Sequence, residues 1–314
     1  MSIIKAVRLG LARGFGSWGL VLGLWLLGVA VALPMTLVVV EVLHGSLGQG
    51  LAHDELREGF DMGWYGEFKA DASGAASTFG PDLLGGGAFF RNIESWLTGG
   101  LFDASYGLLG MGALYGLLWA LVWGGVISRF ASPDEGSGPG RLLTRGAEFF
   151  FRFVRLALLS APLYYLIYKL YGWLDDRLGQ WTRDITSEFT MLAITLLLVG
   201  AIGFLLSLVH VCFAYAKIAT VLEDRRSMLF AALRGIGFVL SHPGRALGVY
   251  YVMALVGVIL LAIYSLIAPG PHQASALGVL FAFGVGQLFL MGRLAVRLSL
   301  YAGLVSLYKS LTGG

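Results

Sequence analysis

The chain has 314 residues, of which 57% are hydrophobic and only 13% are charged, and its net charge is +3. Ordinary globular domains carry roughly 25% charged residues, so this composition excludes a soluble domain with a polar surface on every side. The sequence pI is about 9.0. The basic residues are spread over short segments and form no clustered face, which argues against nucleic-acid binding.

Long apolar runs recur along the chain, and a helix of about 20 apolar residues crosses a hydrocarbon core of about 30 Å. The sequence therefore predicts an all-α, polytopic membrane protein with six transmembrane helices in one membrane domain, residues 1–314. The expected spans lie near residues 17–42, 104–128, 153–173, 190–216, 246–268 and 275–307.

The charged residues indicate the orientation of these spans, because Lys and Arg accumulate on the cytoplasmic side of a membrane. Sixteen of the 22 basic residues fall on the side of both termini, and fourteen of the 19 acidic residues fall on the other side. We therefore expect both termini and the loops 129–152 and 217–245 in the cytoplasm, with the protein in the bacterial cytoplasmic (inner) membrane.

The segment 45–103 is expected to be an acidic, helical insertion on the outer side. Apolar residues recur every four positions from Leu56 onwards, a spacing typical of one helix face, and a second short helix, AFFRNIESWLTGG, follows. The segment is long for a simple connection. It is interpreted either as a cap over the bundle or as a docking surface for a protein partner. The candidate docking residues are Phe60, Trp64, Phe68 and Trp96.

The loop 217–245 contains a predicted amphipathic helix from about Ser227 to Leu240, suited to lying in the headgroup plane with its apolar face towards the membrane. Two interpretations are open for this stretch. It is a structural connector, or it binds anionic lipid headgroups. The candidate lipid-binding residues are Arg225, Arg226, Arg234 and Arg245.

The last span carries polar residues, which are costly inside a membrane and often functional. Arg293 and Arg297 are one helical turn apart, with Gln287 before them and Tyr301 after them. The two arginines either snorkel to the inner headgroups or form a structural pair, or they contribute to an internal anion or lipid-headgroup site.

Three segments that lead into outward-going spans resemble one another when aligned on Arg8, Arg145 and Arg234. The inward-going spans also end alike, with WGGVISRF, YAKIATVL and YAGLVSLY. Recurrence in register with the spans predicts three hairpin repeats, each made of a cytoplasmic in-plane helix, a span outwards and a span back.

The stretch from Tyr215-Ala216-Lys217 to Glu223-Asp224-Arg225, followed by Ala231-Ala232-Leu233-Arg234, is similar to uncharacterised bacterial six-span membrane proteins. It also resembles the membrane domain fused to some glycerophosphodiester phosphodiesterases. The resemblance covers mainly the second half of the chain. It implies the six-span architecture and carries over no catalytic residues.

The sequence has no phosphate-binding loop, metal-ligand motif or nucleophile motif, and its single cysteine is Cys212. We therefore expect a protein without enzymatic activity, cofactor or bound metal. The predicted function is that of a membrane scaffold or accessory subunit, with membrane lipids and an outer protein partner as its contacts. The alternative is a transporter, channel or lipid-handling protein with a polar pathway near the last span, in which His210 is a further candidate.

Overall fold

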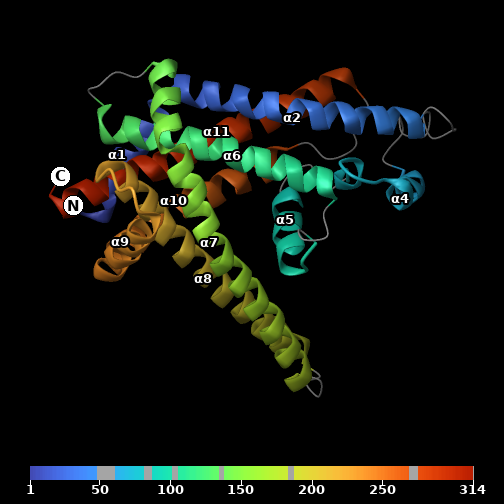
Figure 1. Ribbon diagram of the computed structural model, residues 1–314. Coiled ribbons are helices and arrows are strands. Elements are labelled where there is room, and N and C mark those ends of the chain that lie inside the picture. Colours follow the sequence, from blue (N-terminus) through green and yellow to red (C-terminus); the bar gives the residue numbers. More distant parts are fainter. Residues whose placement is uncertain are drawn as a thin grey trace. The chain divides into compact units, whose positions relative to one another are not determined.

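The computed structural model describes residues 1–47, 61–80, 87–100, 105–133, 138–182, 187–268 and 275–313 (Figure 1). Within these ranges the chain forms ten α-helices, one short 3-10 helix and no β-strand. The prediction of an all-α fold is confirmed.

Six of the helices are long and apolar enough to cross a membrane. Each of them overlaps one of the six apolar segments expected from the sequence. Long apolar helices of this kind are typical of an integral membrane protein. They are α2 (Trp18–Leu47), α6 (Tyr106–Ala131), α7 (Pro139–Trp181), α8 (Glu188–Leu222), α10 (Pro243–Ile267) and α11 (Ala276–Thr312).

Helix α7 differs most from the expected segment, because it begins within the loop expected at 129–152 and runs for 43 residues. At 1.5 Å per residue such a helix is about 65 Å long, which is more than twice the thickness of a hydrocarbon core. Pro139 stands in its first turn, where a proline is well tolerated. Between Pro139 and Pro162 no proline interrupts the chain. The second lead-in segment is therefore the first part of a long helix.

Two shorter helices, α1 (Ile3–Phe15) and α9 (Met228–Ser241), precede α2 and α10. Gly16 and Ser17 separate α1 from α2, and the Ser17 carbonyl accepts hydrogen bonds from the first turn of α2. His242 separates α9 from α10, and the following Pro243 begins α10. A proline disfavours helical backbone at the residue before it, so α9 ends where the sequence predicts.

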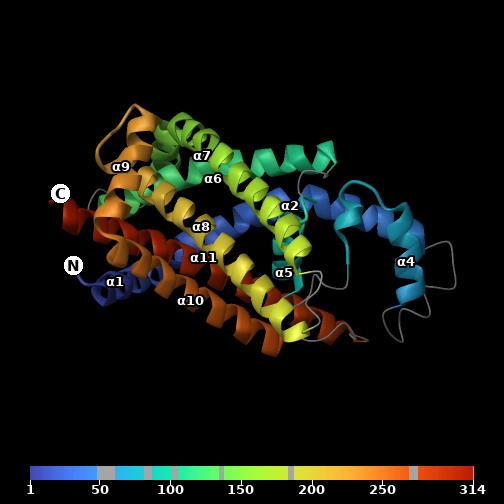
Figure 2. The same ribbon diagram turned by 90° about the horizontal axis from the view of Figure 1, so that it is seen from below.

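The chain divides into two compact units. The first unit comprises Met1–Ala12, Leu117–Val252 and Ser299–Gly314. Figures 1 and 2 show the two chain ends and α9 at one end of this unit, with α7 and α8 running side by side. Its largest fully buried side chains include Tyr215, Tyr301 and Tyr308.

The second unit comprises Arg13–Gly116 and Met253–Leu298. Within it Trp25 Nε1 on α2 donates a hydrogen bond to Gln287 Oε1 on α11 at 2.8 Å. The second unit also contains the short elements α4 (Met62–Asp71), η1 (Ala76–Thr78) and α5 (Gly87–Leu97).

Candidate functional site: the Glu223 cluster

The site begins at the turn that ends α8. Asp224 has a φ of +45°, and the Arg225 amide donates to the Thr220 carbonyl at 3.2 Å. Left-handed backbone is uncommon for residues other than glycine, although aspartate tolerates it better than most. The turn places three consecutive charged residues, Glu223, Asp224 and Arg225, between α8 and α9.

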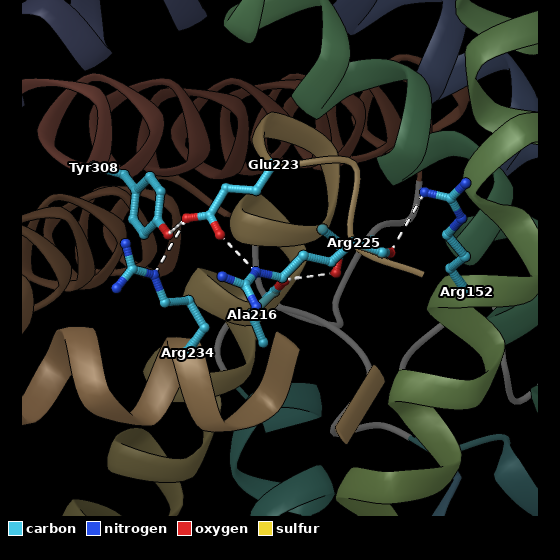
Figure 3. Close-up of polar contacts among 7 residues, drawn as sticks. Arg152, Ala216, Glu223, Arg225, Arg234 and Tyr308 are labelled. Carbon is cyan, nitrogen blue, oxygen red and sulfur yellow. Dashed lines mark hydrogen bonds and ion pairs between the residues drawn. The ribbon is translucent and has the colours of Figure 1, made fainter. Parts of the chain in front are cut away.

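Glu223 is the centre of a hydrogen-bonded cluster, which we call the Glu223 cluster (Figure 3). Arg225 Nε donates to Oε2 at 2.5 Å, and Arg234 Nε on α9 donates to Oε1 at 3.2 Å. The hydroxyl of Tyr308 on α11 also donates to Oε1. The carboxylate therefore joins the end of α8 to α9 and α11.

The surroundings of Glu223 keep it ionised. Partial burial alone raises the pKa of the Glu223 carboxyl, but the hydrogen bonds from Tyr308, Arg225 and Arg234 outweigh it and lower this pKa. The pKa of Arg234 is raised by its proximity to Tyr308 and Glu223. At neutral pH the cluster thus contains one carboxylate and two guanidinium ions.

Helix α7 joins the same turn through a second ion pair. Arg152 Nη1 lies 2.5 Å from Asp224 Oδ1 and 3.4 Å from the Arg225 carbonyl oxygen. The hydrogen bond from Arg152 lowers the pKa of the Asp224 carboxyl. The side chain of Asp224 is 66% exposed, and solvent weakens such a pair considerably. Glu223 is the better shielded of the two acids.

Aromatic rings pack beside the cluster. Phe238 on α9 lies 4.5 Å from the ring centroid of Tyr215 and 4.7 Å from that of Tyr308. The sequence places Phe238 on the polar face of α9, where it conflicts with an amphipathic pattern. The structure resolves this conflict, because α8 and α11 cover Phe238 and leave it 6% exposed.

The four arginines proposed to bind lipid headgroups have two different environments. Arg225 and Arg234 form ion pairs with Glu223. Arg226 and Arg245 are exposed, and neither forms an ion pair within the described ranges.

The polar residues of the last span are not gathered at one site. Gln287 accepts the hydrogen bond from Trp25, whereas Arg293 and Arg297 are exposed. Tyr301 is buried and its ring stacks on Trp123 with 4.2 Å between centroids.

Two of the proposed docking residues on the outer side are buried. Trp64 and Phe68 stack on each other and pack with Tyr65 and Ala76 in a local cluster. Trp64 Nε1 also donates to Ser46 Oγ at 3.0 Å. Trp96 on α5 is half-buried, and Phe60 lies outside the described residues. Little of Trp64 or Phe68 is left for a partner to contact.

Glycines allow close approach towards the C-terminal ends of α6, α8 and α11. A Cβ on Gly235 of α9 would lie 2.6 Å from the Ala216 amide nitrogen of α8. A Cβ on Gly124 of α6 would lie 3.2 Å from the Gly146 Cα of α7, and one on Gly303 of α11 would lie 3.2 Å from the Ala6 carbonyl oxygen of α1. Each of these helix ends packs against a lead-in segment.

Sequence reasoning identified Arg225 and Arg234 but missed their partners Glu223 and Tyr308. Tyr308 is 85 residues from Glu223, and no local pattern links the two. The one available signal was that Glu223 and Asp224 are two of only five acidic residues on the side expected to be cytoplasmic.

Within the described residues, no group of three or more His, Cys, Asp or Glu side chains is placed to hold a metal ion. Comparisons with protein-family models, curated proteins and solved structures give no match to this chain. The chemistry of the site therefore has to be argued from its own geometry.

Proposed function

We propose that the protein is a non-enzymatic scaffold or accessory subunit of a larger membrane assembly. The observation that carries the proposal is the Glu223 carboxylate, which accepts hydrogen bonds from Arg225, Arg234 and Tyr308. A catalytic base works best when its pKa is near the working pH, whereas the surroundings of Glu223 lower its pKa. This geometry suits a carboxylate that holds helix ends together.

We also propose that the chain contains a threefold repeat, an arrangement that suits a scaffold. Gly146 and Gly235 occupy the same position in the alignment of the lead-in segments, one residue after the aligned arginine. Their contacts correspond as well, because Gly146 meets Gly124 and Gly235 meets Ala216. Gly124 and Ala216 are themselves aligned, each following the aromatic residue that begins the shared ending.

A third contact lies outside the aligned positions but joins the corresponding elements, since Gly303 near the end of α11 meets Ala6 of α1. Three hairpins joined in this cyclic way form a continuous layer of lead-in segments and helix ends. We place this layer and both termini in the cytoplasm, on the basis of the charge distribution.

The bacterial cytoplasmic membrane is the proposed location. Exposed Arg226 and Arg245 suit contact with anionic lipid at the inner face. On α9 the exposed residues Leu229, Leu233 and Leu240 suit insertion below the headgroups. We also propose that the protein is related to six-span bacterial membrane proteins, including the membrane domains fused to some glycerophosphodiester phosphodiesterases.

A protein partner is expected to dock on the outer side through α5. Its residues Phe89 and Phe90 are exposed, whereas Trp64 and Phe68 are buried in their own cluster. The contrast favours α5 as the partner-facing helix.

Native mass measurement in a gentle detergent tests the proposed function. We expect a stoichiometric complex heavier than the 33.7 kDa chain. The complex should dissociate on Phe90→Ser but persist on Phe230→Ser, which alters an exposed phenylalanine of α9. A strictly monomeric protein without a co-purifying partner contradicts the proposal.

The alternative function, a transporter, channel or lipid-handling protein, requires a polar pathway near the last span. The hydrogen bond between Gln287 and Trp25 gives Gln287 a structural role instead. Solute or lipid flux that Arg293→Gln abolishes in reconstituted vesicles would favour this alternative.

A further inference from the structure

A cavity of about 150 Å³ lies in the first unit, where the end of α6 and the beginning of α7 meet the last turn of α8. This is far more than the roughly 10–15 Å³ that one water molecule requires. Three arginines line the cavity, Arg129 from α6 and Arg141 and Arg145 from α7. None of the three was singled out as a binding residue from the sequence.

The helix ends around the cavity add to its positive character. Gly138, the N-cap of α7, lines the cavity and offers no side-chain hydrogen bond to the first turn of the helix. A helix N-terminus carries about half a positive charge and unpaired amide groups. The end of α6 would contribute the opposite charge, but Lys309 Nζ donates to its Ala131 carbonyl.

An existing ion pair is compatible with an anion in the cavity. Arg145 Nη1 lies 2.9 Å from Glu148 Oε2, and both side chains are about 40% exposed. A guanidinium has five N–H donors in a planar fork, so it can bridge a carboxylate and a second anion.

The rest of the lining combines Ser128 and Ser132 with apolar side chains, among them Leu142, Phe149 and Leu222. A cavity with guanidinium groups beside apolar side chains matches a phosphate group attached to a glycerol backbone. Arg129 is in the last turn of the apolar helix α6, where the headgroup region of a membrane begins.

We propose that this cavity binds a phosphate group, carried either by an anionic phospholipid headgroup or by free inorganic phosphate. Arg129, Arg141 and Arg145 contact the phosphate oxygens, and the N-terminus of α7 faces the same anion. The site is independent of the scaffold role, because it needs neither a partner nor the Glu223 cluster.

The test uses the full-length protein in a zwitterionic detergent. Binding of phosphatidylglycerol, with phosphatidylcholine as the neutral reference lipid, is measured by native mass spectrometry. Inorganic phosphate is titrated separately by thermal shift. The cavity variant is Arg141→Gln/Arg145→Gln, and the control is Arg8→Gln/Arg155→Gln, which removes the same charge from exposed positions that neither line the cavity nor belong to the proposed lipid-binding arginines.

We expect the cavity variant to bind phosphatidylglycerol roughly tenfold or more weakly, as loss of charged hydrogen bonds implies, and the control less than threefold. Saturable stabilisation of the wild type by phosphate would assign a free anion, and its absence a lipid headgroup. Equal weakening in both variants, or no saturable binding of either probe, overturns the proposal.

A conservative variant covers the case in which the double variant does not fold. Arg141→Lys keeps the charge but loses the planar fork, so it should weaken binding by a few-fold while the protein elutes as wild type in gel filtration. Unchanged binding in this variant, with the double variant unfolded, likewise counts against the site.

Discussion

At the scale of single residues, the proposed scaffold role depends most on the Glu223 side chain. It is the shared acceptor of three donors from the turn, α9 and α11, and its side chain is only 25% exposed. Removing its charge leaves two arginines facing a neutral group, which is more costly than the loss of an exposed pair.

We predict that Glu223→Gln lowers the free energy of unfolding by about 2 kcal/mol. The control Asp224→Asn should cost clearly less, because that ion pair is exposed and asparagine tolerates left-handed backbone. Thermal melting in detergent measures both. Equal losses for the two variants would show that Glu223 has no special role.

The same substitution has a predicted pH dependence. The pKa of Glu223 is lowered from its ordinary 4.5 in the folded protein, so the stabilisation is fully present above that pH. It is lost as the pH falls through the lower folded-state pKa. The difference in melting temperature between wild type and Glu223→Gln should therefore be constant near pH 7 and shrink below about pH 4.5. A difference that grows on acidification contradicts this.

At the scale of elements, the packing of α9 on α8 is the most specific contact. Gly235 lies against the backbone of α8, where neighbouring atoms cannot move aside, whereas a Cβ on Gly237 would meet nothing within 4 Å. Both glycines lie inside the same helix, which makes them a matched pair.

Gly235→Ala is predicted to destabilise the protein by about 1–3 kcal/mol through overpacking. Gly237→Ala should instead be neutral or stabilising by up to about 1 kcal/mol, because alanine favours helix. The two melting temperatures in detergent should thus move in opposite directions or differ by several degrees. Indistinguishable variants would mean that α9 does not pack closely on α8.

The six long helices could be predicted from sequence because hydropathy is a local property that recurs over 20 residues. The beginning of α7 could not, since the basic residues that indicated a cytoplasmic loop are equally compatible with a continuing helix. The burial of Phe238 and the bond between Glu223 and Tyr308 depend on which helices meet, and such long-range contacts leave no trace in local spacing.

At the scale of the whole molecule, the proposed arrangement of three hairpins has six spans, which requires both termini on the same side of the membrane. The first unit is consistent with this, because α1 and the end of α11 lie together within it. We propose from the charge distribution that this side is cytoplasmic.

Cysteine labelling tests this topology most directly. The only cysteine, Cys212, is buried, so Cys212→Ala gives a background for the exposed positions Ser2→Cys, Ser310→Cys, Tyr106→Cys and Glu188→Cys. In spheroplasts, an impermeant maleimide should label positions 106 and 188 at once, and positions 2 and 310 only after permeabilisation. Labelling of position 2 or 310 in sealed spheroplasts, or protection of 106 and 188, would contradict the three-hairpin arrangement.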